Sequence, residues 1–356
     1  MNEEELRLQF EEEDRINTTI PPDDIIAFNE QRSCADLFRM YNQKQLDISP
    51  DFQRGIVWSP LSQTLFVDSL IKQLPIPSMC ISLDCKTQKR YVIDGLQRIS
   101  TIIKFLSNDD WKLSCTKDID PRISGKTVRE IKDSDDLLFE KVENMIIPIT
   151  ILRCDYTKPN HMEYLFHIFS RLNSGGNKLY NQEIRNCVFQ GPFNSFLKEI
   201  VRTDYWKNFA KVDDSQIITA RFSNEERVLR FLAFYYEQNQ YNGRLASFLN
   251  NFMEKNRIPS QDKIESFQKL VVDTLIIATK LRIPEDIFKN KNLVEGILVG
   301  IAHNISNLTK LSSSAIQTRL NSLLKEPPYS NEIREGLAHT DKVLERLNTS
   351  IKCFSK

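Results

Sequence analysis

The chain has 356 residues, of which 40% are hydrophobic and 27% are charged, and its 48 Lys and Arg balance its 48 Asp and Glu. This composition is typical of a globular protein, and the length predicts two domains with room for a sizeable core. The balance excludes a constitutively basic nucleic-acid binder. No apolar run approaches the ~18 residues of a membrane helix, and the seven cysteines include no C-x-x-C pair that would indicate zinc. We therefore expect a reduced, cytoplasmic protein without membrane association.

The zero net charge hides an asymmetry along the chain. Residues 1–24 contain nine acidic residues against two arginines, whereas the remainder has seven more basic than acidic residues. We interpret residues 1–24 as an acidic, mobile N-terminal arm, which is the usual meaning of such a terminal run. The alternative is an arm that shields a basic groove on the body from nucleic acid.

From residue 25 to about residue 158 the patterns are mixed. A helix over 31–49 is predicted from Leu37, Phe38 and Tyr41, which are spaced for one buried face. Residues 47–58 are expected to be extended, with a turn. Ser59 and Pro60 are typical of a helix N-cap and first position, and apolar residues at three- and four-residue spacing continue that helix to Leu74. Strands are predicted over 79–83, 90–94 and 146–152, and a helix over 99–106.

Beyond residue 159 the strand-like runs almost disappear. Amphipathic or buried helices are predicted over 161–172, 181–189, 194–206, 224–238, 244–255, 260–281, 293–308, 312–324 and 331–347. The predicted fold class is therefore α+β, with a mixed N-terminal domain followed by an all-helical C-terminal half.

Glycine is scarce, with ten in the chain, and four of the ten fall in three short polar segments. These segments are Gln53-Arg54-Gly55, Asp94-Gly95-Leu96-Gln97-Arg98 and Asn173-Ser174-Gly175-Gly176. Because glycine lets the backbone turn sharply or approach a ligand closely, these loops are the first candidates for a site.

The middle segment is the most informative of the three. It is predicted as a strand, a turn at Asp94-Gly95 and a helix, a unit that directs backbone N–H groups and the positive helix end at whatever lies over the turn. The planar fork of Arg98 suits phosphate oxygens, and Asp94 suits a divalent ion. The alternative is a structural Asp–Arg pair at a tight turn. Gln53 and Arg54 have the same two interpretations, and the third segment is either an anion-binding nest or a plain connection between helices.

In this order the three segments resemble the N-terminal domain family of GmrSD-type restriction endonucleases, which is grouped with the ParB/sulfiredoxin-like fold. The resemblance is carried by Phe52-Gln53-Arg54 with Trp58, by residues 93–102 and by residues 169–183, and it covers roughly residues 30–190. Residues 227–234 also resemble the helical part of stand-alone members. The resemblance implies a ParB/sulfiredoxin-like nucleotide-binding domain over 25–190, followed by a helical domain over 191–356.

The resemblance also implies a function. It indicates a module that binds a nucleoside triphosphate and hydrolyses it with Mg²⁺, and that controls a DNA-acting activity in restriction or anti-phage defence. Carried over by position, the catalytic residues would be Asp94, Gln97 and Arg98, and the nucleotide-binding residues Gln53, Arg54, Gly95, Arg98, Asn173, Gly175 and Gly176, with Asp94 and Asn173 as metal ligands. Leu96 stands where many members have glutamine; if that glutamine orients the attacking water, hydrolysis is slow here while binding survives.

The partners that the resemblance implies are DNA and a separate nuclease or another defence protein, and a homo-oligomer stays open. The four histidines do not fit the His-Asn-His nuclease domain that restriction members usually carry. Ser124-Gly125-Lys126-Thr127 lacks the earlier glycine and the preceding strand of a P-loop, so we interpret it as a turn. The alternative function is a non-catalytic DNA-binding or adaptor protein that partners a separate nuclease.

Overall fold

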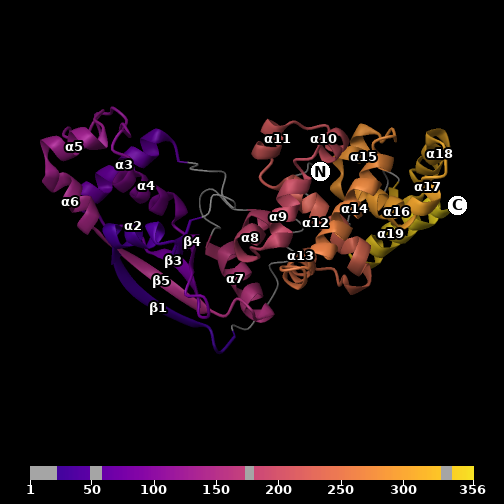
Figure 1. The fold of residues 1–356 in the computed structure, drawn as a ribbon, viewed down its shortest axis with the longest axis horizontal. Helices are drawn as coiled ribbons and strands as arrows, with labels where there is room; N and C mark the ends of the chain where they lie inside the picture. The colour runs from indigo at the N-terminus through magenta and orange to yellow at the C-terminus, as the bar shows by residue number, and fades with distance from the viewer. Residues whose placement is uncertain (1–21, 49–57, 173–179, 330–338) are drawn as a thin grey trace. The chain divides into compact units, whose positions relative to one another are not determined.

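The computed structural model describes residues 22–48, 58–172, 180–329 and 339–356, so residues 1–21 of the expected acidic arm lie outside it. The chain forms two compact units, which comprise the described parts of Ile20–Leu179 and of Tyr180–Lys356 (Figure 1). We call them the sheet unit and the helical unit and treat each by itself.

The sheet unit combines a five-stranded mixed sheet with helices. Its elements are β1 (Ile26–Ser33), α2 (Cys34–Asn42), β2 (Leu46–Asp47), α3 (Pro60–Ile71), β3 (Met79–Asp84), β4 (Arg90–Asp94), α4 (Leu96–Ser107), α5 (Val128–Ser134), α6 (Asp136–Asn144), β5 (Ile146–Cys154) and α7 (Pro159–Leu172). The strand order is β1-β5-β3-β4-β2. β5 is antiparallel to β1 and parallel to β3, and β4 is antiparallel to β3 and parallel to β2.

The core of the sheet unit lies along the central strand. All six residues of β3 are buried, which requires cover on both faces of the sheet at this strand. Helices α2, α3, α4 and α6 pack on one another beside the sheet, and α7 packs against β4 (Figure 1). The strands predicted over 79–83, 90–94 and 146–152 are confirmed.

The helix predicted over 31–49 is wrong at both ends. Residues 26–33 form β1, an edge strand whose exposed, largely polar residues give no alternating pattern. The helix begins only at Cys34, because the Ser33 side chain accepts the N–H of Asp36, and it ends at Asn42. Its buried apolar residues are Cys34, Leu37 and Met40, whereas the expected core residue Tyr41 is exposed.

The start of α3 is confirmed, with Ser59 as N-cap and Pro60 in the first turn. Its end and its buried face differ from the prediction. The helix stops at Ile71 instead of Leu74, and Leu61, Leu65 and Leu74 are exposed. The face that is buried carries polar residues as well as apolar ones, including Gln63, Thr64 and Asp68.

The helical unit has no strand in the residues that the structure describes, which confirms the predicted all-helical half. Its elements are α8 (Asn181–Val188), α9 (Pro192–Ile200), α10 (Asp204–Ala210), α11 (Asp214–Thr219), α12 (Ser223–Glu237), η2 (Gln238–Gln240), α13 (Leu245–Lys255), α14 (Gln261–Ala278), α15 (Glu285–Lys289), α16 (Lys291–His303), α17 (Ile305–Leu308), α18 (Ser313–Leu323), η3 (Pro327–Tyr329) and α19 (Thr340–Ser355).

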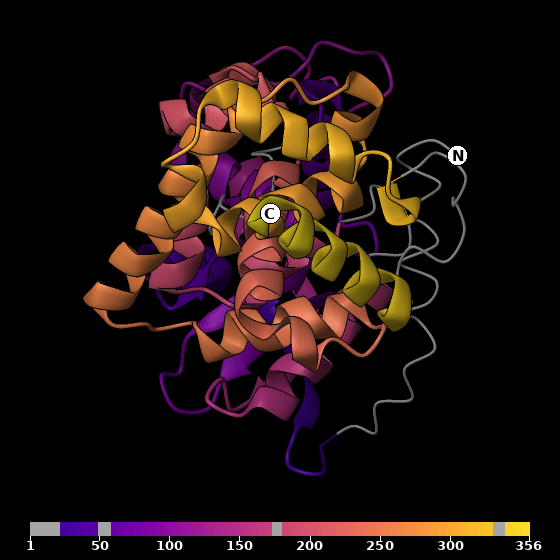
Figure 2. The ribbon, with the colours of Figure 1, turned by 90° about the vertical axis from the view of Figure 1, so that its right-hand side faces the viewer.

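Helix α16 is the centre of the helical unit. All its residues from Asn292 to Ala302 are buried, the property of a helix surrounded by others, and α12, α14 and α19 lie against it; α19 crosses in front in Figure 2. A Cβ on Gly296 would lie 2.1 Å from the Tyr329 hydroxyl, and one on Gly300 would lie 2.1 Å from the Ser350 hydroxyl. Glycine is therefore required for this close approach.

Three of the long predicted helices have different limits in the structure. The helix predicted over 194–206 is two helices, because Thr203 adopts an extended conformation and caps α10. The helix predicted over 293–308 breaks at Asn304, whose amide donates to the carbonyls of Gly300 and Ile351. The last helix runs to Ser355, beyond the predicted 347, and its predicted first part falls in 330–338, outside the described residues.

Candidate functional site

The candidate site is built around the junction of β4 and α4, where the predicted strand, turn and helix are confirmed. Gly95 is the N-cap of α4 and has a φ of +95°, in the left-handed region. A Cβ at this position would also lie 2.7 Å from Cγ of Met79. Backbone conformation and packing therefore both require glycine here. The junction directs the first-turn N–H groups of α4, the positive end of the helix, toward the space over the turn.

Asp94 and Arg98 lie on the two sides of this glycine and bond each other. Arg98 Nη2 donates to Asp94 Oδ2 at 2.8 Å, so the structural Asp–Arg pair considered above is present. Arg98 Nη1 also donates to the carbonyl of Pro77 at 2.5 Å. The guanidinium thus braces the turn against the segment before β3. The Asp94 side chain remains 37% exposed and is accessible to a ligand.

Gln97, in the first turn of α4, reaches back to an earlier segment. Its Oε1 accepts the backbone N–H of Trp58 at 3.2 Å. The carbonyl of the same Trp58 accepts from Gln63 Nε2 at 3.1 Å. Gln97 therefore occupies the junction as expected, with its carboxamide bonded to the residue that ends the first motif. Gln63 was not predicted from the sequence; its only signal is a polar residue on the buried face of α3.

The other expected site residues are not placed by the structure. Gln53, Arg54, Asn173, Gly175 and Gly176 all lie outside the described residues, so their roles stay predictions.

Glu183, the last residue of the third motif, lies in the helical unit and is almost fully buried. Its Oε2 accepts the N–H of Tyr180, which caps α8. Arg221 donates to both of its carboxylate oxygens, at 2.9 Å and 2.6 Å, and lies 3.7 Å over the Tyr180 ring. The glutamate of the motif therefore anchors the start of α8.

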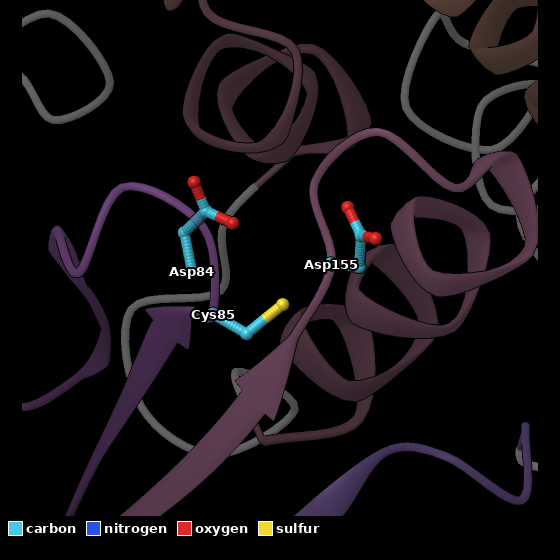
Figure 3. A group of neighbouring side chains, drawn as sticks. All are labelled: Asp84, Cys85 and Asp155. Carbon is cyan, nitrogen blue, oxygen red and sulfur yellow. The ribbon is translucent and has the colours of Figure 1, made fainter.

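Asp84, Cys85 and Asp155 bring three potential metal-ligand atoms within 4.8 Å of one another where β3 and β5 end (Figure 3). The carboxylates of Asp84 and Asp155 already accept hydrogen bonds within their local turns. Asp84 accepts from the N–H and hydroxyl of Thr87, and Asp155 accepts from the N–H and hydroxyl of Thr157. The Thr157 bonds and Lys86 lower the pKa of Asp155 to about 2. We interpret the group as turn chemistry. The metal ligand expected at Asp94 belongs to no such group within the part of the chain that the structure describes.

Two further expectations concern absent features. The segment from Ser124 to Thr127 is a turn, as predicted: the Ser124 hydroxyl donates to the carbonyl of Thr116, and Thr127 caps α5 in a reciprocal bond with Glu130. Among the described residues, no helix has the length and apolar character needed to cross a membrane.

Comparison with known proteins gives one match. Residues 34–190 match the family of the GmrSD restriction endonuclease N-terminal domain. No curated protein and no solved structure matches the chain. The match spans the segments that carry the resemblance, including the β4–α4 junction.

Proposed function

We propose that this chain is a nucleotide-dependent module of DNA restriction, because residues 34–190 match the family of the GmrSD restriction endonuclease N-terminal domain. It binds a nucleoside triphosphate with Mg²⁺ over the β4–α4 junction, hydrolyses it slowly, and uses the bound state to control a DNA-acting partner. The observation that carries the proposal is left-handed Gly95 between Asp94 and Arg98, at the start of a helix and within the matched segment.

The geometry supports a division of roles among these residues. The N–H groups that begin α4 would bind phosphate oxygens, because their helix supplies no acceptor for them. Asp94 would contribute an oxygen to Mg²⁺, which prefers carboxylates and phosphates together. Arg98 would hold Asp94 and the Pro77 carbonyl in place and offer its remaining charge to the phosphates.

The test is the thermal unfolding midpoint with ATP, GTP, CTP and UTP, each with Mg²⁺ or with EDTA. A nucleotide at about 100-fold over its Kd stabilises the folded state by about 2.7 kcal/mol and raises the midpoint. We expect a rise with Mg²⁺ that is lost in Arg98→Ala and weakened in Asp94→Asn, which keeps an acceptor for Arg98. Released phosphate measures turnover in the same samples.

The control is Arg122→Ala, which breaks an Asp–Arg contact on the same unit away from the junction. It should respond to nucleotide as wild type does. An unchanged midpoint with all four nucleotides in the wild-type protein would contradict the proposal.

A second candidate function is supported by the charge distribution. Residues 180–356 contain 25 Lys and Arg against 20 Asp and Glu, so most of the positive excess of the body lies in the helical unit. This excess favours a non-catalytic DNA-binding or adaptor protein, whose affinity for DNA would fall with salt and ignore nucleotide.

A further inference from the structure

β1 is a long, open edge of the sheet. Its eight residues, Ile26–Ser33, pair with β5 without a register shift, and no other described strand lies on the far side of β1 (Figure 1). The strand at the opposite edge, β2, has only two residues. Edge strands are commonly very short, or carry a bulge, a proline or lysines that prevent pairing with another chain. β1 has none of these features.

The backbone groups on the open side of β1 follow from the ladder. The Cys34 N–H donates to the Met145 carbonyl at 3.0 Å, one position beyond the last pair of the β1–β5 register. Because bonded positions alternate along an antiparallel strand, the even-numbered residues of β1 are those that bond β5. The N–H and C=O groups of Ala27, Asn29 and Gln31 therefore point away from the sheet, and all three residues are exposed.

The side chains of β1 do not oppose pairing with another strand. Its two charged residues, Glu30 and Arg32, form an ion pair at 2.9 Å, so the strand has no net charge. Ile26 and Phe28 lie on the same face of the strand as this pair and are 50% and 39% exposed. A neutral edge with partly exposed apolar side chains favours a strand as its partner.

A second copy of β1 matches the outward backbone groups. When two β1 strands pair antiparallel about a two-fold axis at Asn29, each Asn29 faces the other, and each Ala27 faces Gln31 of the other copy. Every one of these pairs consists of two outward residues, which is the condition for a hydrogen-bonded pair. Each pair then exchanges two backbone hydrogen bonds.

The charges of β1 select this register over its neighbour. With the axis at Asn29, Glu30 faces Phe28 of the second copy and Arg32 faces Ile26, so no like charges lie directly opposite each other. The two Phe28 rings become diagonal neighbours, a separation that aromatic side chains can span. With the axis at Glu30, the two Glu30 side chains would face each other, and like charges in facing positions are destabilising.

We propose that β1 is a dimerisation strand: two copies of this chain pair antiparallel along residues 26–32, about a two-fold axis at Asn29, and so join their sheets. The two-residue β2 offers too short an edge to continue the assembly, so it closes as a symmetric dimer. The inference goes beyond the proposed function and does not depend on nucleotide binding.

The experiment measures sedimentation of the full chain over a range of protein concentrations. Asn29→Pro removes the central N–H, and because this N–H points away from β5, pairing within the sheet is kept. Asn29→Thr is the matched control, because it keeps the N–H and, like the proline variant, loses the bond from the Thr150 hydroxyl to the Asn29 side chain. Disulfide formation in Asn29→Cys tests the register, because facing residues of a hydrogen-bonded pair have Cα atoms about 5.5 Å apart.

We expect wild type and Asn29→Thr to dimerise. The dimer dissociation constant should rise at least about tenfold in Asn29→Pro, because both bonds of the central pair lose their donor. Under mild oxidation Asn29→Cys should form a covalent dimer, whereas Ala27→Cys, which faces Gln31, should form no more than wild type does through its exposed Cys115. If Asn29→Pro does not fold by circular dichroism, Phe28→Glu decides, because it places a glutamate opposite Glu30 and should weaken the dimer.

Three results would overturn the inference. The first is a wild-type protein that stays monomeric at every concentration, including one in which another part of the same chain protects the amides of residues 27, 29 and 31 from hydrogen exchange. The second is a dimer that Asn29→Pro leaves unchanged, since its interface would lie elsewhere. The third is cross-linking of Ala27→Cys as strong as that of Asn29→Cys, which the two-fold axis at Asn29 does not allow.

Discussion

Glu225, at the start of α12, is a buried carboxylate with an incomplete set of partners. The residue is 5% exposed, and its Oε2 has no hydrogen-bond partner in the described part of the chain. Burial raises the pKa of Glu225 from 4.5 to about 7, although its own backbone N–H and the positive charges of Arg202 and Lys198 favour the ionised form. The folded protein therefore holds a proton that the unfolded chain releases at lower pH.

This raised pKa predicts how stability depends on pH. The raised pKa of Glu225 contributes to the free energy of unfolding, and this contribution is fully present below pH 4.5. It amounts to on the order of 3 kcal/mol and is lost as the pH rises through about 7. We expect Glu225→Gln to raise the unfolding midpoint at pH 8 and to match wild type near pH 4.5. Thermal unfolding at both values measures this. Glu199, an exposed residue on α9, provides the control. If Glu199→Gln raises the unfolding midpoint at pH 8 as much as Glu225→Gln does, the buried carboxyl of Glu225 is not the cause.

At the candidate site, local features were predictable and long-range ones were not. The turn at Gly95 follows from residues 90–99 alone, because a left-handed glycine between a strand and a helix leaves a local sequence pattern. The brace from Arg98 to the Pro77 carbonyl spans 21 residues, and the bond from Lys104 to Gln63 spans 41. Neither interaction leaves a pattern in the sequence, so the sequence leaves Arg98 open as a phosphate ligand or as a structural residue and does not predict the bond made by Gln63.

Among the elements, helix ends explain the largest errors in the predicted limits. Two residues after the end of α2 and of α3 lies a residue in the left-handed region, Lys44 with φ +57° and Gln73 with φ +54°. In α3 the N–H groups of Gln73 and Leu74 bond the carbonyls of Leu70 and Ser69, which completes a Schellman motif. Glycine is the usual residue there, so lysine and glutamine gave no signal. The sequence instead predicts an end at Leu74, because Pro75 and Pro77 follow it and cannot continue a helix.

These two caps predict stabilising substitutions. Lys44→Gly and Gln73→Gly should each raise stability by a few tenths to about 1 kcal/mol, because glycine has no penalty at positive φ and both side chains are exposed. Part of this gain is offset by the greater freedom of glycine in the unfolded chain. Denaturant unfolding measures the effect, with Lys44→Ala and Gln73→Ala as controls that keep the penalty. Alanine variants as stable as the glycine variants would show that backbone strain is not the cause.

At the scale of the whole molecule, the change in composition near residue 159 correctly predicted where strands cease. All five strands of the described chain lie before residue 155, and every later element is a helix. Most of the excess of Lys and Arg over Asp and Glu in residues 25–356 lies in the helical unit. Lys280 and Arg282 lie just after α14, and Lys310 lies just after α17, a helix that contacts α14. All three side chains are exposed, and none forms an ion pair within the described residues. These three cations are therefore available to phosphates.

This arrangement predicts a specific salt dependence if DNA binds the helical unit. The logarithm of the affinity should fall linearly with the logarithm of the salt concentration, with a slope of about −0.9 for each phosphate that the protein neutralises. Changing Lys280, Arg282 and Lys310 together to glutamine should weaken binding to a duplex of any sequence and make the slope shallower by about 0.9 for each phosphate that is no longer neutralised. Lys44, Lys89 and Lys117 are exposed on the sheet unit, and changing them to glutamine alters the net charge equally. If the two triple variants have equal salt-dependence slopes, DNA binds elsewhere on the protein. If the slope of the wild-type protein changes when nucleotide is added, the nucleotide-controlled module is favoured over the non-catalytic adaptor.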